Sequence, residues 1–190
     1  MLSSLIEKIA GELSREGIPY MILGGQAVLL FGEPRLTRDI DITLGAGPEA
    51  LPRVQLVLER VGLEPLAPDP ATFVAKTMVL PARDQATGLR VDLIFSNSSY
   101  EREALQRARV IKVGQTEVRF ISPEDLIIHK LVAGRPRDLE DAKGLLIKNP
   151  GLDFIYLRSW LSRLDQALAM DLSQTLARLE KEIKSRRRDL

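Results

Sequence analysis

The sequence has no cysteine, and this absence excludes several chemistries at once. Disulfide bonds, thiolate zinc sites and a cysteine nucleophile are all impossible. Histidine is scarce as well, because His129 is the only one among 190 residues, and a multi-histidine metal site is therefore excluded. Any metal must be held mainly by oxygen ligands, which suit hard cations such as Mg²⁺ or Mn²⁺.

A long apolar run and a strong charge of either sign are also missing. A transmembrane helix takes about 20 predominantly apolar residues, and no stretch of the sequence provides them. Acidic residues interrupt the N-terminal segment, which is unlike a signal peptide. The sequence therefore predicts a cytoplasmic protein without a membrane partner. The formal net charge of +1 does not by itself require a nucleic-acid partner.

The remaining composition is that of an ordinary globular protein, with 45% hydrophobic and 28% charged residues. Hydrophobic periodicity predicts a mixed α/β catalytic core over residues 1–121 and a helical region over residues 122–190 that completes a cleft. The expected fold class is α+β, with a small mixed β-sheet flanked by helices and a C-terminal helical bundle.

Individual elements follow from the same periodicity, from turn residues and from helix caps. Strands are expected over residues 19–23, 39–44, 73–80, 89–95, 110–113 and 117–121. Helices are expected up to about residue 17 and over residues 26–31, 48–61, 100–108, 136–148, 152–164 and 166–187. Ser122, Pro123 and Asp125 form a pattern typical of a helix start, so a further helix is expected to begin there.

Three carboxylates are the most informative feature of the first half. In a strand over residues 39–44, Asp39 and Asp41 project from one face, and the isoleucines between them face the core. Asp92 lies among apolar residues of a second expected strand. If the two strands are neighbours, Asp92 joins the pair, and three carboxylates suit a two-metal site for phosphoryl transfer.

A glycine pair precedes the carboxylates. Gly24 and Gly25 follow a buried apolar strand and come just before a short helix. Glycine lets backbone N–H groups approach a phosphate closely, and a helix start adds a favourable dipole. The segment therefore predicts a phosphate-binding turn followed by a metal-binding strand.

This order of strand, Gly-Gly, short helix and Asp-Ile-Asp resembles the DNA polymerase β-like nucleotidyltransferase superfamily. Within it, the sequence is most similar to the AbiEii-type branch, which contains abortive-infection and type IV toxin–antitoxin nucleotidyltransferases. The residues that carry this resemblance are Gly24, Gly25, Gln26, Ala27, Arg35, Thr37, Asp39, Asp41, Lys130, Arg135, Arg137, Asp138 and Asp141. Gly25 departs from the wider superfamily, in which serine is common at this position.

The resemblance implies roles for several of these positions and for Asp92. Asp39, Asp41 and Asp92 would be catalytic and ligate Mg²⁺ or Mn²⁺. The nucleotide-binding residues would be Gly24, Gly25, Arg35, Thr37, Lys130 and Asp138. The chain would move an NMP from an NTP to an RNA such as tRNA, a protein or a small molecule. The same resemblance implies that the chain is the toxin of a toxin–antitoxin pair, with a cognate antitoxin as its partner.

Other interpretations remain open from the sequence. Asp-x-Asp also occurs on exposed strands without a ligand, and a lysine such as Lys130 is often a solvated helix residue. Two further functions are a non-catalytic NTP-binding module, such as a toxin–antitoxin partner, and a metal-dependent phosphohydrolase. The glycine pair before Asp39 favours the transferase over the phosphohydrolase.

Overall fold

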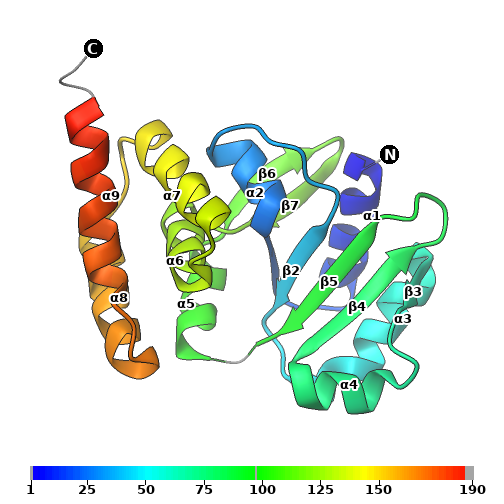
Figure 1. Ribbon diagram of the computed structural model, residues 1–190. Helices are drawn as coiled ribbons and strands as arrows, with labels where there is room; N and C mark the ends of the chain where they lie inside the picture. Colours follow the sequence, from blue (N-terminus) through cyan, green and yellow to red (C-terminus); the bar gives the residue numbers. More distant parts are fainter. Residues whose placement is uncertain (1, 97, 187–190) are drawn as a thin grey trace. The chain divides into compact units, whose positions relative to one another are not determined.

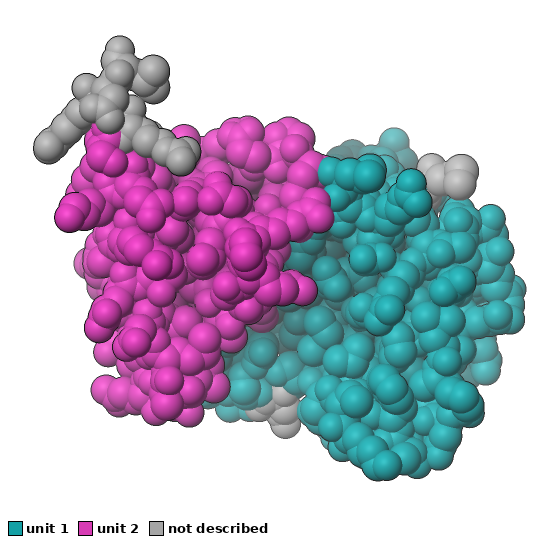
Figure 2. All heavy atoms as spheres, viewed as in Figure 1, with its two compact units in different colours: residues 1–26, 36–121 teal, residues 27–35, 122–190 magenta. Residues whose placement is uncertain are grey.

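The computed structural model describes residues 2–96 and 98–186, and the chain divides into two units. Unit 1 consists of residues 1–26 and 36–121, and unit 2 consists of residues 27–35 and 122–190 (Figure 2). Each unit therefore combines two separate segments of the chain. The short stretch 27–35 belongs with the C-terminal helices, although it is flanked by residues of the first unit.

Unit 1 is built on one mixed sheet. Over the described residues the sheet has seven strands in the order β3-β4-β5-β2-β1-β7-β6 (Figure 1). In chain order the strands are β1 (Tyr20–Leu23), β2 (Ile40–Leu44), β3 (Leu63–Pro65), β4 (Val79–Asp84), β5 (Arg90–Phe95), β6 (Arg109–Val113) and β7 (Thr116–Phe120). Strand β2 pairs with β1 in antiparallel and with β5 in parallel orientation, so it occupies the centre of the sheet.

Helices α1 (Leu2–Arg15) and α3 (Leu51–Val61) contact each other and lie behind the sheet in the view of Figure 1. The buried residues of α1 recur at helical spacing, as its sequence predicts: Leu5, Ile6, Ile9, Ala10 and Leu13. Unit 1 also contains the turn η1 (Pro48–Ala50) and helix α5 (Ser99–Arg107). One sheet face is thus covered by apolar helix surfaces.

The strand expected over residues 73–80 is wrong, because most of it belongs to helix α4 (Pro70–Thr77). Asp69 caps this helix by accepting a hydrogen bond from the backbone N–H of Thr72 at 3.1 Å, and Pro70 occupies the first turn. Met78 ends the helix with φ +60°, and β4 starts at the next residue. Local capping therefore outweighs the apolar run that suggested a strand.

Unit 2 is helical. Its C-terminal helices are α6 (Pro123–Ala133), α7 (Pro136–Lys148), α8 (Phe154–Leu168) and α9 (Leu172–Arg186). Ser122 caps α6, because its hydroxyl accepts a hydrogen bond from the backbone N–H of Asp125 at 3.1 Å, which confirms the expected helix start. Helix α2 (Gly24–Phe31) begins in unit 1, and its residues from Ala27 onward belong to unit 2.

The boundary between the last two helices lies later than the sequence suggests. A break before residue 166 is expected, yet α8 continues to Leu168 and ends at Ala169, which has φ +52°. The Asp165 carboxylate then accepts hydrogen bonds from the backbone N–H groups of Leu172 and Ser173 at the start of α9. Residue 187, where the last helix was expected to end, lies outside the described residues.

Within the part of the chain that the structure describes, none of the helices has the length and apolar character that a membrane span requires.

Candidate active site

The carboxylates of Asp41 and Asp92 come from strands that are direct neighbours. Asp41 of β2 pairs with Asp92 of β5 in parallel register, and residues paired in this way point to the same face of a sheet. Both side chains are partly exposed. The residues on either side of them are fully buried: Ile40, Ile42, Val91 and Leu93. The structure therefore meets the condition that the two strands are neighbours, and their register places Asp41 and Asp92 side by side.

Asp39 lies one residue before β2 and is exposed. It is two residues from Asp41, so the alternation of an extended chain favours the same face for both. The side-chain amide of Gln26 donates a hydrogen bond to the backbone oxygen of Asp39 at 3.1 Å. Gln26 is itself only 5% exposed. The first turn of α2 thus fixes the chain where it enters β2.

The glycine pair is needed because the chain passes very close to β2. Gly24 has φ +62°, and a Cβ at this position would collide with Oδ2 of Asp41 and lie 2.8 Å from its Cγ. A Cβ on Gly25 would lie 2.7 Å from the Cβ of Thr37. Since the first N–H groups of a helix have no partner within the helix, α2 directs N–H donors suited to an anion to the place beside Asp41.

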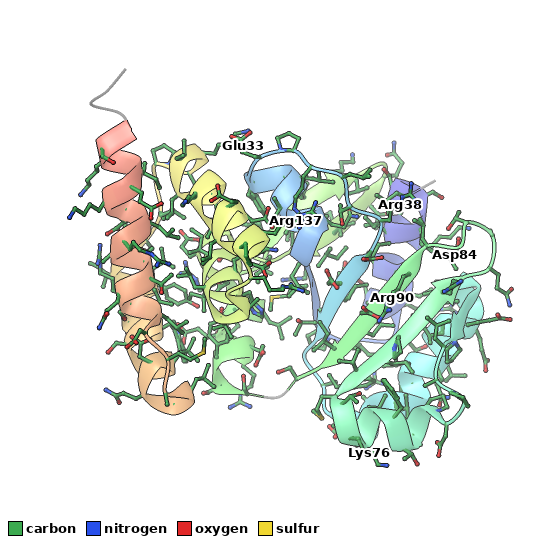
Figure 3. All side chains as sticks on the ribbon, viewed as in Figure 1. Glu33, Arg38, Lys76, Asp84, Arg90 and Arg137 are labelled. Carbon is green, nitrogen blue, oxygen red and sulfur yellow. The ribbon has the colours of Figure 1, made fainter. Side chains whose placement is uncertain are left out.

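Arg90 forms an ion pair with Asp92 from the same strand. Its Nε lies 3.0 Å from Oδ1 and 3.1 Å from Oδ2 of the carboxylate. Figure 3 labels Arg90 on the sheet of unit 1. The hydrogen bond with Asp92 raises the pKa of Arg90, and the negative charges of Asp39 and Asp41 raise it further. The three carboxylates therefore act on a single guanidinium group.

The donor atoms at this face suit a hard divalent cation. Asp39, Asp41 and Asp92 offer carboxylate oxygens, and the register of β2 and β5 sets two of them next to each other. Across residues 2–96 and 98–186, however, no group of three His, Asp or Glu side chains is arranged to hold a metal ion with the side chains as they stand. The Arg90 guanidinium already neutralises part of the negative charge here. The oxygen atoms of these residues are suitable ligands for a cation, and Arg90 competes with that cation for Asp92.

Arg90→Gln is expected to bind Mn²⁺ more tightly than the wild-type protein. An exposed ion pair is worth up to about 1 kcal/mol, so the gain should be about 2- to 5-fold in the dissociation constant. Titration calorimetry with Mn²⁺ measures it. Arg119→Gln is the matched control, because Arg119 is exposed on β7 of the same unit and its loss changes the net charge equally. Equal Mn²⁺ affinity of the two variants would show that Arg90 does not compete with the cation.

A second charged cluster lies in unit 2. The Lys130 ammonium group contacts Oδ1 of Asp138 and Oδ2 of Asp141, each at 2.8 Å. All three residues are buried, with exposed fractions of 6%, 2% and 7%. The guanidinium of Arg135 binds the other oxygen of Asp138 at 2.6 Å, and that of Arg35 binds Asp141. Lys130 is therefore a buried ion-pair partner rather than the solvated helix residue that its sequence also allowed.

Asp138 makes the stability of this cluster sensitive to acid. Burial alone would raise the pKa of Asp138, but hydrogen bonds from Arg135 and Lys130 outweigh it, so the pKa lies below its ordinary value of 3.8. Such a carboxyl stabilises the fold above its unfolded pKa, and the stabilisation is lost as the pH falls through the folded pKa.

The free energy of unfolding of wild type should therefore exceed that of Asp138→Asn by a constant amount above about pH 5 and by less below about pH 4. Urea unfolding at a series of pH values measures the free energy of unfolding of the two proteins. Parallel curves for the two proteins down to about pH 2 would contradict this origin of the acid sensitivity.

The predicted site residues thus fall into two groups. Unit 1 holds Gly24, Gly25, Thr37, Asp39, Asp41 and Asp92, and unit 2 holds Arg35, Lys130 and Asp138. Two further residues take part in these groups. Arg90, which the sequence analysis does not single out, pairs with Asp92. Asp141, which the resemblance matches without assigning it to the site, lies between Lys130 and Arg35. The spacing of Arg90 and Asp92 on one strand could have indicated their pairing, because residues two apart share a face.

Comparisons with known proteins identify the family and the fold of the chain. The family model described as an uncharacterised nucleotidyltransferase matches residues 1–179. No protein with a curated description matches the chain.

Several solved structures share the fold. The solution structure of the antibiotic-resistance factor ANT(2'')-Ia is similar with a TM-score of 0.60 and 18% identity, over 88% of this chain and 95% of that chain. A nucleotidyltransferase-like protein from Paracoccidioides brasiliensis has a TM-score of 0.58 and 17% identity, over 93% and 92% of the two chains. The crystal structure of ANT(2'')-Ia with adenylyl-2''-tobramycin has a TM-score of 0.54 and 17% identity, over 96% and 98%. These similarities confirm the expected α+β nucleotidyltransferase fold.

Proposed function

This chain belongs to the nucleotidyltransferase family, and we propose that it transfers an NMP from an NTP to an acceptor at the face that carries Asp39, Asp41 and Asp92. The observation that supports this assignment most strongly is the parallel register of Asp41 with Asp92, directly beside the Gly24 turn. An anion-binding helix start and neighbouring carboxylates are the two components that a metal-assisted phosphoryl transfer needs.

In the proposed reaction, the oxygen of an acceptor hydroxyl attacks the α-phosphorus of the NTP. A new oxygen–phosphorus bond forms, the bond from the α-phosphorus to the bridging oxygen breaks, and pyrophosphate leaves with that oxygen. The backbone N–H groups of Gly24 and Gly25 hold the triphosphate. Asp92 accepts the proton of the attacking hydroxyl. Catalysis then rests on positioning and on charge neutralisation.

Divalent cations bound by Asp39, Asp41 and Asp92 would neutralise charge on the triphosphate and align the attacking and leaving oxygens. Mg²⁺ usually takes only one or two protein carboxylates and completes its shell with phosphate oxygens and water. Mg²⁺ or Mn²⁺ is therefore the proposed cofactor, and the partial exposure of Asp41 and Asp92 leaves room for substrate oxygens.

The acceptor and the branch within the superfamily stay predictions. An RNA such as tRNA and a protein are acceptor classes suggested by the AbiEii-type resemblance, and a cognate antitoxin is the partner that it suggests. A small hydroxylated molecule is a third class, because the solved relative ANT(2'')-Ia carries an adenylylated antibiotic. The assignment of residues 1–121 as catalytic core and residues 122–190 as the region completing the cleft also stays a prediction.

The test is a labelling experiment with the full chain. The protein is incubated with Mg²⁺ or Mn²⁺ and each of the common NTPs, labelled at either the α- or the γ-phosphate. RNA, protein and small-molecule fractions of a cell extract are supplied separately. We expect the α-label to enter one fraction and the γ-label to appear in pyrophosphate.

Other results would point to the alternative functions. NTP binding without pyrophosphate release in any fraction supports a non-catalytic NTP-binding module. Cleavage of RNA or another phosphoester in the absence of NTP supports a metal-dependent phosphohydrolase.

A further inference from the structure

Unit 1 has a cavity of about 710 Å³ at the start of β1, whereas Gly24 follows the end of this strand. In the register of β1 with β2, Tyr20 pairs with Leu44 and Leu23 pairs with Asp41. Tyr20, which lines the cavity, and Leu23 are three residues apart, which is about 10 Å along a strand. The cavity therefore lies at the opposite end of the strand pair from the proposed transfer site.

The described residues that line the cavity all belong to unit 1 and come from several of its elements. Ser14 lies near the end of α1, Leu105 lies on α5, and Arg119 lies on β7. Around the cavity, the backbone N–H of Gly45 donates to the backbone oxygen of Pro19 at 2.7 Å. A Cβ at Gly45 would lie 2.8 Å from Cδ1 of Leu105. The surrounding segments are thus closely packed against one another, as in a preformed ligand pocket.

The charge around the cavity is positive. Arg102 of α5 and Arg119 of β7 line it, and both side chains are exposed. None of the described residues that line the cavity is acidic. Tyr20 adds an uncharged phenol, because burial raises its pKa although the nearby charge of Arg119 lowers it. Since a guanidinium binds carboxylate and phosphate oxygens through paired hydrogen bonds, the cavity favours an anion.

Much of the remaining lining is apolar. Ile18, Tyr20 and Leu105 line the cavity and are buried, so they offer apolar surface that water covers only poorly. Pockets for small organic ligands are commonly about 300–1,000 Å³ and combine an apolar lining with a few polar groups. The cavity has this size and this composition. An inorganic ion would leave the apolar surface uncovered, so an organic anion suits the cavity better.

We propose that this cavity is a second binding site of the chain, for a small organic anion. Arg102 and Arg119 hold its carboxylate or phosphate group, and its apolar body lies against Ile18, Tyr20 and Leu105. The inference goes beyond the proposed function, because it needs neither the NTP nor the three carboxylates. A carboxylic acid and a phosphate ester share the chemistry that the cavity recognises, and the experiment below distinguishes them.

Four probes separate the contribution of the charge from that of the apolar body. Phenyl phosphate and benzoate carry both, inorganic phosphate carries only the charge, and benzyl alcohol carries only the body. Each is titrated into the full chain without divalent cation, and two-dimensional ¹⁵N–¹H NMR spectra report the affinity. We expect phenyl phosphate or benzoate to bind at least about 10-fold more tightly than inorganic phosphate and benzyl alcohol. The tighter of the two identifies the preferred anionic group.

The same spectra show where the probe binds. The backbone amide signals of Leu105, Gln106 and Arg119, which line the cavity, should shift with saturable dependence on the probe concentration. The signals of Gly24 and Asp41 should stay in place, since they lie at the other end of the strand pair. Saturable binding that leaves the cavity signals unshifted overturns the proposal.

Charge-removing variants test the two guanidinium groups. Arg102→Gln and Arg119→Gln should each weaken binding of the tighter probe by about 5-fold, the upper range for an exposed ion pair. Arg109→Gln is the matched control, because Arg109 is exposed on β6 of the same unit and does not line the cavity. It should bind the probe like the wild type. Equal affinity of all three variants overturns the proposal.

A substitution that fills the cavity tests the apolar contact without a change of charge. Ser14 is exposed and lines the cavity, so Ser14→Phe places a ring where the body of the probe would lie. This variant should lose most of its affinity for phenyl phosphate and benzoate while its NMR spectrum remains that of a folded protein. Binding as tight as that of the wild type contradicts the assigned place.

The inference and the proposed function can fail separately. Wild-type protein that binds neither phenyl phosphate nor benzoate overturns the second site, whatever its transfer activity. Saturable binding of either probe at the cavity supports the second site even in a chain that transfers no label from NTP.

Discussion

Asp41→Asn is expected to lower nucleotidyl transfer by about 10³-fold or more, because it removes a carboxylate that would hold the cation, and that cation neutralises the reacting phosphates. The fold should remain intact. Asparagine has the same shape, and Asp41 lies directly beside Asp92, so the change also relieves repulsion between two neighbouring carboxylates. Transfer of α-labelled NTP measures the activity, and thermal unfolding without metal should show a midpoint that is equal to or above that of the wild type.

The matched control is Glu117→Gln. Glu117 is exposed on β7 of the same unit, so the substitution changes the net charge equally at a site without a proposed role. It should keep wild-type transfer. A folded Asp41→Asn protein that transfers label at a rate close to the control would contradict the role assigned to this carboxylate.

Gly24→Ala is expected to have the second largest effect. Its φ of +62° disfavours any residue with a Cβ by about 1–2 kcal/mol. The added methyl would also overlap Oδ2 of Asp41, so either the turn or the carboxylate must move. Since small displacements of reacting groups are costly, transfer should fall by about 100-fold or more even where the protein still folds.

Gly11→Ala is the corresponding control. Gly11 lies within α1, and no atom of the surrounding structure lies within 4 Å of the place that an added methyl would take. Alanine should therefore raise the free energy of unfolding by about 0.5–1 kcal/mol and leave transfer unchanged. Chemical denaturation and label transfer are measured on both variants. Gly24→Ala with wild-type transfer and wild-type stability would show that the close approach to Asp41 is not required.

The alternation around the carboxylates could be predicted because it is local. Ile40 and Ile42 flank Asp41, Val91 and Leu93 flank Asp92, and the strand period of two assigns opposite faces to apolar and acidic residues. The pairing of β2 with β5 cannot be predicted in the same way, since strand neighbours depend on the whole sheet. Helix α4 was missed because its cap at Asp69 competes with an apolar run that also suits a strand.

The contacts of Arg35 could not be predicted from the sequence. Arg35 and Asp141 are 106 residues apart, and their hydrogen bonds depend on how the segment 27–35 packs against α7. The burial of Lys130 has the same origin, because an amphipathic helix pattern does not show which polar residues find partners inside. The tertiary packing of unit 2 therefore determines both the contacts of Arg35 and the burial of Lys130.

The claim that Asp39, Asp41 and Asp92 form a divalent-cation site can be tested most directly by Mn²⁺ binding, followed by electron paramagnetic resonance of the free ion. Wild-type protein and Glu117→Gln should show the same saturable binding, and Asp41→Asn should bind at least about 10-fold more weakly. Equal Mn²⁺ binding by wild type and folded Asp41→Asn would contradict the site.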